Sequence, residues 1–102
     1  MAQLRELIDE QLAHGEALLP VTGNSMWPLL AGGRDMVRLT RLDRRVQRGD
    51  IVLYQRADGS YILHRVIRLS ASGDCICCGD AQWEREQVNE AQIIAYVTAF
   101  RR

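Results

Sequence analysis

The segment T-G-N-S-M-W-P, residues 22–28, carries the first candidate for chemistry in this chain. A serine hydroxyl is protonated at neutral pH, so Ser25 becomes a nucleophile only beside a base that takes its proton. The alternative interpretation is that Asn24 or Ser25 merely caps a turn. Residues 22–28 can therefore be part of a catalytic site only if the sequence supplies a base for Ser25.

Only histidine can serve as that base in the usual way. All thirteen basic residues are arginine, and without any lysine a Ser–Lys dyad is excluded. His14 falls near the end of an expected helix, where a solvated or dipole-interacting role is the default. His64 lies in Y-I-L-H-R-V-I, where strand alternation places it on one face with Ile62 and Val66. A lone histidine on an apolar strand face is more often a satisfied core group than a base.

Backbone groups near Ser25 could supply the rest of a site. Pro28 restricts the preceding residue and suits the first turn of a helix, which Gly32-Gly33 would end. Ser25 would then lie at the mouth of that turn. We expect the backbone around Asn24, Ser25 and Met26 to offer amides to a developing oxyanion.

Three cysteines, Cys75, Cys77 and Cys78, form a second candidate cluster. A structural zinc needs four ligands, and C-x-C-C lacks both the usual spacing and a second pair. On a strand, Cys75 and Cys77 face one way and Cys78 the other. We therefore expect small buried side chains rather than a metal site, and no cofactor.

The bulk properties predict one soluble domain. The chain has 102 residues, is 47% hydrophobic, and balances thirteen basic against thirteen acidic residues, so no global charge favours nucleic acid. No apolar run approaches the roughly 20 residues that span a bilayer, and no signal peptide is evident. Closely spaced thiols fit a reducing compartment. We expect a cytoplasmic protein, the alternative being a peripheral one at the inner face of the membrane.

An amphipathic helix is expected first, in residues 1–20, with Gly15 marking its end. Leu4, Leu7, Ile8 and Leu12 follow the helical period. This apolar stripe is expected to pack on the rest of the fold, the alternative being a membrane surface or a partner. The polar face is acidic, which argues against anionic lipid.

Residues 21–102 are expected to form a compact, mostly antiparallel β domain. The strand candidates are 35–40, 50–56, 60–69, 75–78 and 91–100, with an exposed connection at 42–49. Asp58-Gly59 between two apolar runs predicts a hairpin whose two turn residues have positive φ. Residues 70–73 predict a second turn.

Four motifs together carry a resemblance. V-T-G-N-S-M-W-P, G-D-I-V-L-Y (49–54), L-H-R-V-I (63–67) and G-D-A-Q (79–82) occur in the order and spacing of signal-peptidase-like serine peptidases, the superfamily that includes LexA-type repressor domains. The similarity runs from about Val21 to Phe100. It implies a signal-peptidase/LexA-like β fold with Ser25 as nucleophile. It is closest to the histidine-base branch, which implies His64 as base and Asp80 as the residue that orients it.

This sequence departs from the family pattern at two positions. Ala81 stands where asparagine is usual, and Gly23 stands where many signal peptidases carry a serine that donates to the oxyanion. The resemblance thus implies a small soluble serine peptidase acting on a peptide or protein, in peptide maturation or export. The rival interpretation is an inactive peptide-binding or accessory module of the same fold. A self-cleaving repressor fragment is weaker, since no lysine base exists.

Overall fold

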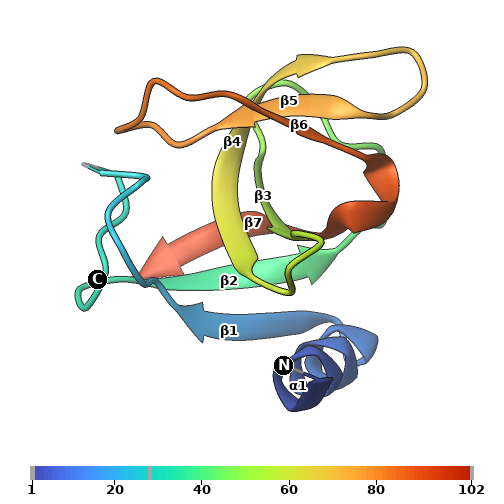
Figure 1. Cartoon of the computed structure of the whole chain (residues 1–102). Helices are drawn as coiled ribbons and strands as arrows, with labels where there is room; N and C mark the ends of the chain where they lie inside the picture. The colour runs from blue at the N-terminus through green and yellow to red at the C-terminus, as the bar shows by residue number, and fades with distance from the viewer. Residues whose placement is uncertain (1, 28, 102) are drawn as a thin grey trace.

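One N-terminal helix is followed by a seven-stranded sheet (Figure 1). The computed structural model describes residues 2–27 and 29–101. The helix and strands are α1 (Ala2–Ala13), β1 (Glu16–Pro20), β2 (Met36–Arg41), β3 (Ile51–Gln55), β4 (Tyr61–Leu69), β5 (Cys75–Cys78), β6 (Glu86–Val88) and β7 (Ile93–Arg101). The strand order is β1-β2-β7-β3-β4-β5-β6, and every neighbouring pair is antiparallel. The expected mostly antiparallel β fold with an N-terminal helix is confirmed.

The N-terminal helix is shorter than the sequence predicted. It ends at Ala13, and Gly15 follows with φ +117°, which confirms that Gly15 marks the end of the helix although the predicted helical region reached residue 20. Residues 16–20, which the prediction assigned to the helix, form the edge strand β1 instead. An apolar pair, Leu18-Leu19, satisfies either period over so few residues, which explains the error. In the described part of the chain, no helix is long and apolar enough to cross a membrane.

Two hairpins form where the turn residues predicted them. The β3–β4 hairpin is closed by bonds from Arg56 N to Ser60 O and from Gly59 N to Arg56 O. Only Gly59 has positive φ, at +92°, so the expectation of positive φ at Asp58 as well was wrong. The turn is a three-residue loop with a glycine bulge rather than a two-residue loop. Residues 70–74 repeat the pattern, with Gly73 at φ +95°.

The remaining strands match the predictions to within two residues at each end, with one addition. Residues 42–50 contain no strand. A 3-10 turn at Glu90–Gln92 precedes β7, so that strand starts two residues later than expected. The added strand is β6, three residues long, which the sequence did not predict. It carries a residue of the candidate site.

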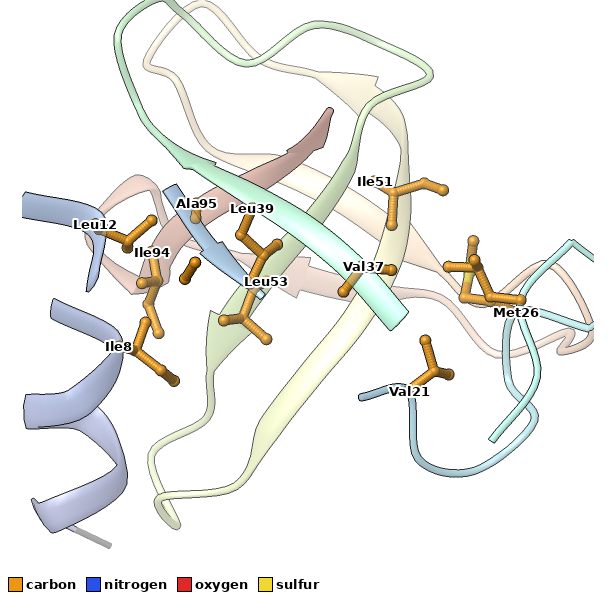
Figure 2. Packing of buried hydrophobic residues seen from close by; sticks show 12 residues of the cluster. Ile8, Leu12, Val21, Met26, Val37, Leu39, Ile51, Leu53, Ile94 and Ala95 are labelled. Atoms are coloured by element: carbon orange, nitrogen blue, oxygen red, sulfur yellow. The ribbon is translucent and has the colours of Figure 1, made fainter. Parts of the chain in front are cut away.

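The core consists of two clusters on the two faces of the curved sheet. The larger runs from Ile8 and Leu12 on α1 to Met26 on the turn that carries Ser25 (Figure 2). The smaller includes Val52, Tyr54 and Val66. Of the four apolar residues that follow the helical period, Ile8 and Leu12 are buried, whereas Leu4 and Leu7 are 40% and 55% exposed. The apolar stripe of the helix therefore packs on the fold through half of its residues.

Candidate active site

A tight turn presents Ser25 beside the core. Trp27 N donates to Asn24 O over 3.1 Å, which places Ser25 and Met26 at the two central positions. Met26 is only 2% exposed and fastens the turn to the larger cluster. The helical turn predicted to begin at Pro28 starts outside the described residues, and residues 29–34 form turns and bends. Ser25 is thus held by a buried neighbour on its own turn.

Two glycines close the base of this segment. Gly32 N donates to Gly23 O over 2.8 Å, and a Cβ on Gly32 would lie 2.6 Å from Gly23 N. Gly23 itself has φ +72°, a conformation that other residues rarely adopt. Gly23 therefore has a backbone role in this turn.

The loop at residues 79–82 packs directly on Ser25. Ala81 N donates to Ser25 O over 2.8 Å, and Asp80 N lies 3.4 Å from Met26 Sδ. A Cβ on Gly79 would lie 2.9 Å from Ser25 Cβ. Because the contact at Ala81 uses the main chain, it does not depend on the side chain at position 81. G-D-A-Q therefore fixes the position of the serine.

Backbone donors remain free around Ser25. Among the hydrogen bonds of the described residues, none is donated by the amides of Asn24, Ser25 or Met26. Unpaired amides on a tight turn can donate hydrogen bonds to an oxyanion. The amides of the three residues expected to supply such donors are therefore unpaired among the described residues.

Ser25 and His64 line the same cleft, which has a volume of about 410 Å³. His64 lies on β4 and is 6% exposed, and its neighbours in the cleft include Arg56, Tyr61 and Leu63. In the described part of the chain, no hydrogen bond joins the Ser25 hydroxyl to the His64 imidazole. The structure thus brings the two side chains to one cavity without joining them directly. Catalytic hydrogen bonds are often long in the absence of substrate.

The two ring nitrogens of His64 differ in their surroundings. Nδ1 lies 3.2 Å from Tyr54 Oη, whereas Nε2 has no hydrogen-bond partner among the described residues. The one fully buried side-chain nitrogen or oxygen without a partner in those residues is Tyr61 Oη. His64 Nε2 is therefore accessible to solvent, and His64 lines the cleft.

Asp80 lies near the site but does not hold the imidazole. Both of its carboxylate oxygens are bound by Arg65, at 2.9 Å from Nε and 2.8 Å from Nη2. Arg65 also donates to Gly49 O. The expected hydrogen bond from Asp80 to His64 is thus not formed, because the arginine next to the histidine takes the carboxylate.

A different carboxylate reaches the histidine, through a tyrosine. Tyr54 on β3 is fully buried, and its hydroxyl donates to Glu86 Oε1 over 2.8 Å while it contacts His64 Nδ1. Arg56 binds both oxygens of Glu86. Neither Tyr54 nor Glu86 was predicted from the sequence to be a site residue. The available signal was a tyrosine within the buried run D-I-V-L-Y, because a buried phenol usually has a polar partner.

Burial and these neighbours set the protonation of the site. Burial lowers the pKa of His64, which the negative charges of Glu86 and Asp80 oppose and the positive charge of Arg56 assists. Hydrogen bonds from Arg56 lower the pKa of Glu86. Burial, and then Glu86, raise the pKa of Tyr54. At neutral pH the site therefore contains a neutral imidazole, a neutral phenol and an ionised carboxylate.

The other sequence candidates lie away from this chemistry. Cys75 and Cys77 are buried with their sulfurs 3.6 Å apart, and Cys78 faces the other way, as predicted. In residues 2–27 and 29–101, no group of three acidic, histidine or cysteine side chains could hold a metal ion. His14 follows the end of α1 and is exposed.

Comparisons with protein-family models, with curated proteins and with solved structures find no match for this chain.

Proposed function

We propose that this protein is a serine peptidase of the signal-peptidase type, in which Ser25 is the nucleophile and His64 the general base. The observation that carries the proposal is that Ser25 and His64 line the same cleft. Nδ1 of His64 contacts Tyr54, whereas Nε2 has no hydrogen-bond partner among the described residues. The lowered pKa of His64 favours the same role, because a base must be unprotonated at working pH.

The chemistry would be acyl transfer. As Ser25 Oγ attacks the carbonyl carbon of the scissile bond, His64 Nε2 takes the hydroxyl proton. The oxygen of the tetrahedral intermediate is then stabilised by the free amides around Ser25. Collapse breaks the C–N bond, and His64 returns the proton to the leaving amine. Water, activated by His64, hydrolyses the acyl-serine ester and restores both residues.

A peptide substrate would bind as an added strand. Residues 61–64 of β4 pair with β3, and β5 pairs only with residues 65–69, so the first half of β4 has a free edge among the described strands. β1 pairs only with β2, and Leu19–Gly23 line the same cleft. Free strand edges bind extended peptides through main-chain hydrogen bonds. The apolar lining, which includes Val37, Leu53 and Leu63, favours apolar side chains next to the scissile bond.

The rival function is peptide binding without cleavage. One observation favours it: the Ser25 hydroxyl is not hydrogen-bonded to His64. Both functions use the same cleft and the same strand edges, so the reactivity of Ser25 distinguishes them.

A peptide library read by mass spectrometry tests the proposal. Wild type is compared with Ser25→Ala and His64→Ala, and with Ser72→Ala and His14→Ala as exposed controls of the same residue types. We expect cleavage by wild type and both controls, and none by the two site variants. If Ser25→Ala and His64→Ala cleave as wild type does, the mechanism is refuted. Retention of peptides without cleavage by every form would establish the rival.

A further inference from the structure

The strongest unassigned feature of the molecule is the chain of contacts from Glu86 through Tyr54 to His64. It joins three strands: Tyr54 on β3, His64 on β4 and Glu86 on β6. Val52, two residues before Tyr54, is the direct cross-strand partner of His64, so the phenol reaches the imidazole diagonally across the hairpin. Arg56, just after β3, holds Glu86 at the far end of this chain of contacts by binding its carboxylate.

The direction of each hydrogen bond follows from counting protons. A phenol has one hydrogen to donate, and an ionised carboxylate can only accept. Arg56 keeps Glu86 ionised, so the Tyr54 hydrogen points at Glu86 Oε1, 2.8 Å away. Tyr54 Oη can then only accept from His64, and the hydrogen in the 3.2 Å contact belongs to Nδ1.

We infer that Tyr54 and Glu86 are positioning residues that hold neutral His64 as its Nδ1–H tautomer, with the Nε2 lone pair directed into the cleft. A neutral imidazole carries one N–H, so a hydrogen on Nδ1 leaves Nε2 as the acceptor. Its effect on catalysis rests on the proposed function, but the tautomer itself does not. The pair replaces the carboxylate that contacts histidine directly in a Ser-His-Asp site.

The same contacts from Glu86 through Tyr54 stabilise the positive charge that catalysis would create on His64. When Nε2 takes a proton, the imidazolium keeps its Nδ1–H bond to Tyr54, and Glu86 supplies the negative charge. The other charged groups that act on His64 are Arg56, which opposes its protonation, and Asp80, which assists it. Asp80, whose oxygens are bound by Arg65, raises the pKa of His64 less than Glu86 does.

Nitrogen-15 NMR of the imidazole rings tests the inference, since tautomers differ in their Nδ1 and Nε2 shifts. The chain has two histidines, and exposed His14 serves as internal reference. Above its pKa, wild-type His64 is expected to be predominantly Nδ1–H. In Tyr54→Phe, the Nε2–H form is expected to grow at least several-fold. Tyr61→Phe is the matched control, because the Tyr61 hydroxyl has no hydrogen-bond partner in residues 2–27 and 29–101, and its spectrum should equal that of wild type.

Glu86→Gln gives a second test in a partly exposed residue, which protects against a misfolded Tyr54 variant. Loss of the Glu86 charge is expected to move the His64 titration to lower pH. A wild-type His64 in the Nε2–H form overturns the inference, as does an unchanged tautomer in folded Tyr54→Phe or an unchanged titration in Glu86→Gln. These readouts need no activity, so the peptidase proposal can fail while the tautomer assignment stands.

If cleavage is observed, Tyr54→Phe should lower kcat by about tenfold or more with KM unchanged, because the substrate does not touch Tyr54. Tyr96→Phe should leave kcat unchanged, because the Tyr96 hydroxyl binds Asp43 and Tyr96 is not among the residues that line the cleft. An unaltered kcat in folded Tyr54→Phe would overturn the catalytic part of the inference.

Discussion

Gly79 lies against Ser25 so closely that a Cβ at Gly79 would be 2.5 Å from the Ser25 carbonyl oxygen. Gly79 is buried and has no positive φ, so the requirement is for space and not for backbone freedom. A glycine 54 residues away in the sequence thus determines where the candidate nucleophile lies. The G-D-A-Q motif acts on the site by packing, in addition to any charge it supplies.

Gly79→Ala is expected to displace the Ser25 turn. The added methyl group would meet main-chain atoms that cannot rotate away, and overpacking of this kind costs about 1–3 kcal/mol. We expect kcat/KM to fall at least about tenfold and the free energy of unfolding to fall by a similar 1–3 kcal/mol. Ala81→Ser is the control, because it enlarges an exposed side chain in the same loop. Equal activity of Gly79→Ala and wild type would show that the contact does not position Ser25.

Activity is expected to rise with pH on a single limb. Only neutral His64 can accept the serine proton, and burial places its pKa below the ordinary value of about 6.5. The midpoint of kcat/KM against pH should therefore lie below about 6.5. Arg56→Gln removes a charge that lowers this pKa, so its midpoint should move to higher pH. Arg68→Gln, an exposed change at the far end of β4, should not move it.

The same shift predicts the pH dependence of stability. The folded state holds His64 neutral at pH values where the unfolded chain is already protonated, so the unfolded state binds more protons there. The contribution of His64 to the free energy of unfolding should be complete above about pH 6.5 and decrease as pH falls toward the lower folded-state pKa. The free energy of unfolding, measured by denaturant melts and plotted against pH, should have a different slope for wild type and for His64→Gln across this range. Parallel curves would contradict the burial argument.

Asp80→Asn separates the two carboxylates near His64. Asp80 is bound to Arg65 at the surface, so the substitution should change stability by about 0–1 kcal/mol. Because Asp80 makes no hydrogen bond to His64, kcat/KM should fall less than about tenfold, with Arg65→Gln behaving alike. A loss with Asp80→Asn as large as that with His64→Ala would reinstate Asp80 as the orienting residue.

Tyr61→Phe is expected to stabilise the protein. The Tyr61 hydroxyl is buried without a partner in the described part of the chain, and such groups cost about 1–3 kcal/mol. Removing the oxygen should raise the free energy of unfolding by about 1 kcal/mol, measured by denaturant melts. Tyr54→Phe, which breaks two hydrogen bonds, should lower it. A destabilised Tyr61→Phe would mean that the hydroxyl has a partner, such as an ordered water.

The sequence predicted those parts of the fold that depend on local chemistry. Asp58-Gly59 and Ser72-Gly73 identified two hairpins because glycine is required at the positive-φ position of each turn. β1 was missed because its five residues continue the apolar pattern of the helix. β6 was missed because E-Q-V is short and mostly polar, and its strand conformation depends on pairing with β5.

The candidate site was predictable only where residues act alone. Ser25 could be selected as a candidate because a serine nucleophile needs a base. His64 could be selected as that base because the sequence contains two histidines. The partner of His64 could not, because Tyr54 and Glu86 reach it across three strands. Arg65, adjacent in sequence to His64, removes Asp80 from that role, and only the structure shows this pairing.

The most direct test of the central claim is kcat/KM of His64→Ala relative to wild type, on a peptide that the library identifies as cleaved. Loss of general-base catalysis should lower kcat/KM at least about 100-fold in a folded protein, while His14→Ala stays at the wild-type value. Folded His64→Ala with wild-type kcat/KM would contradict the account, because no lysine exists to replace His64 as the base.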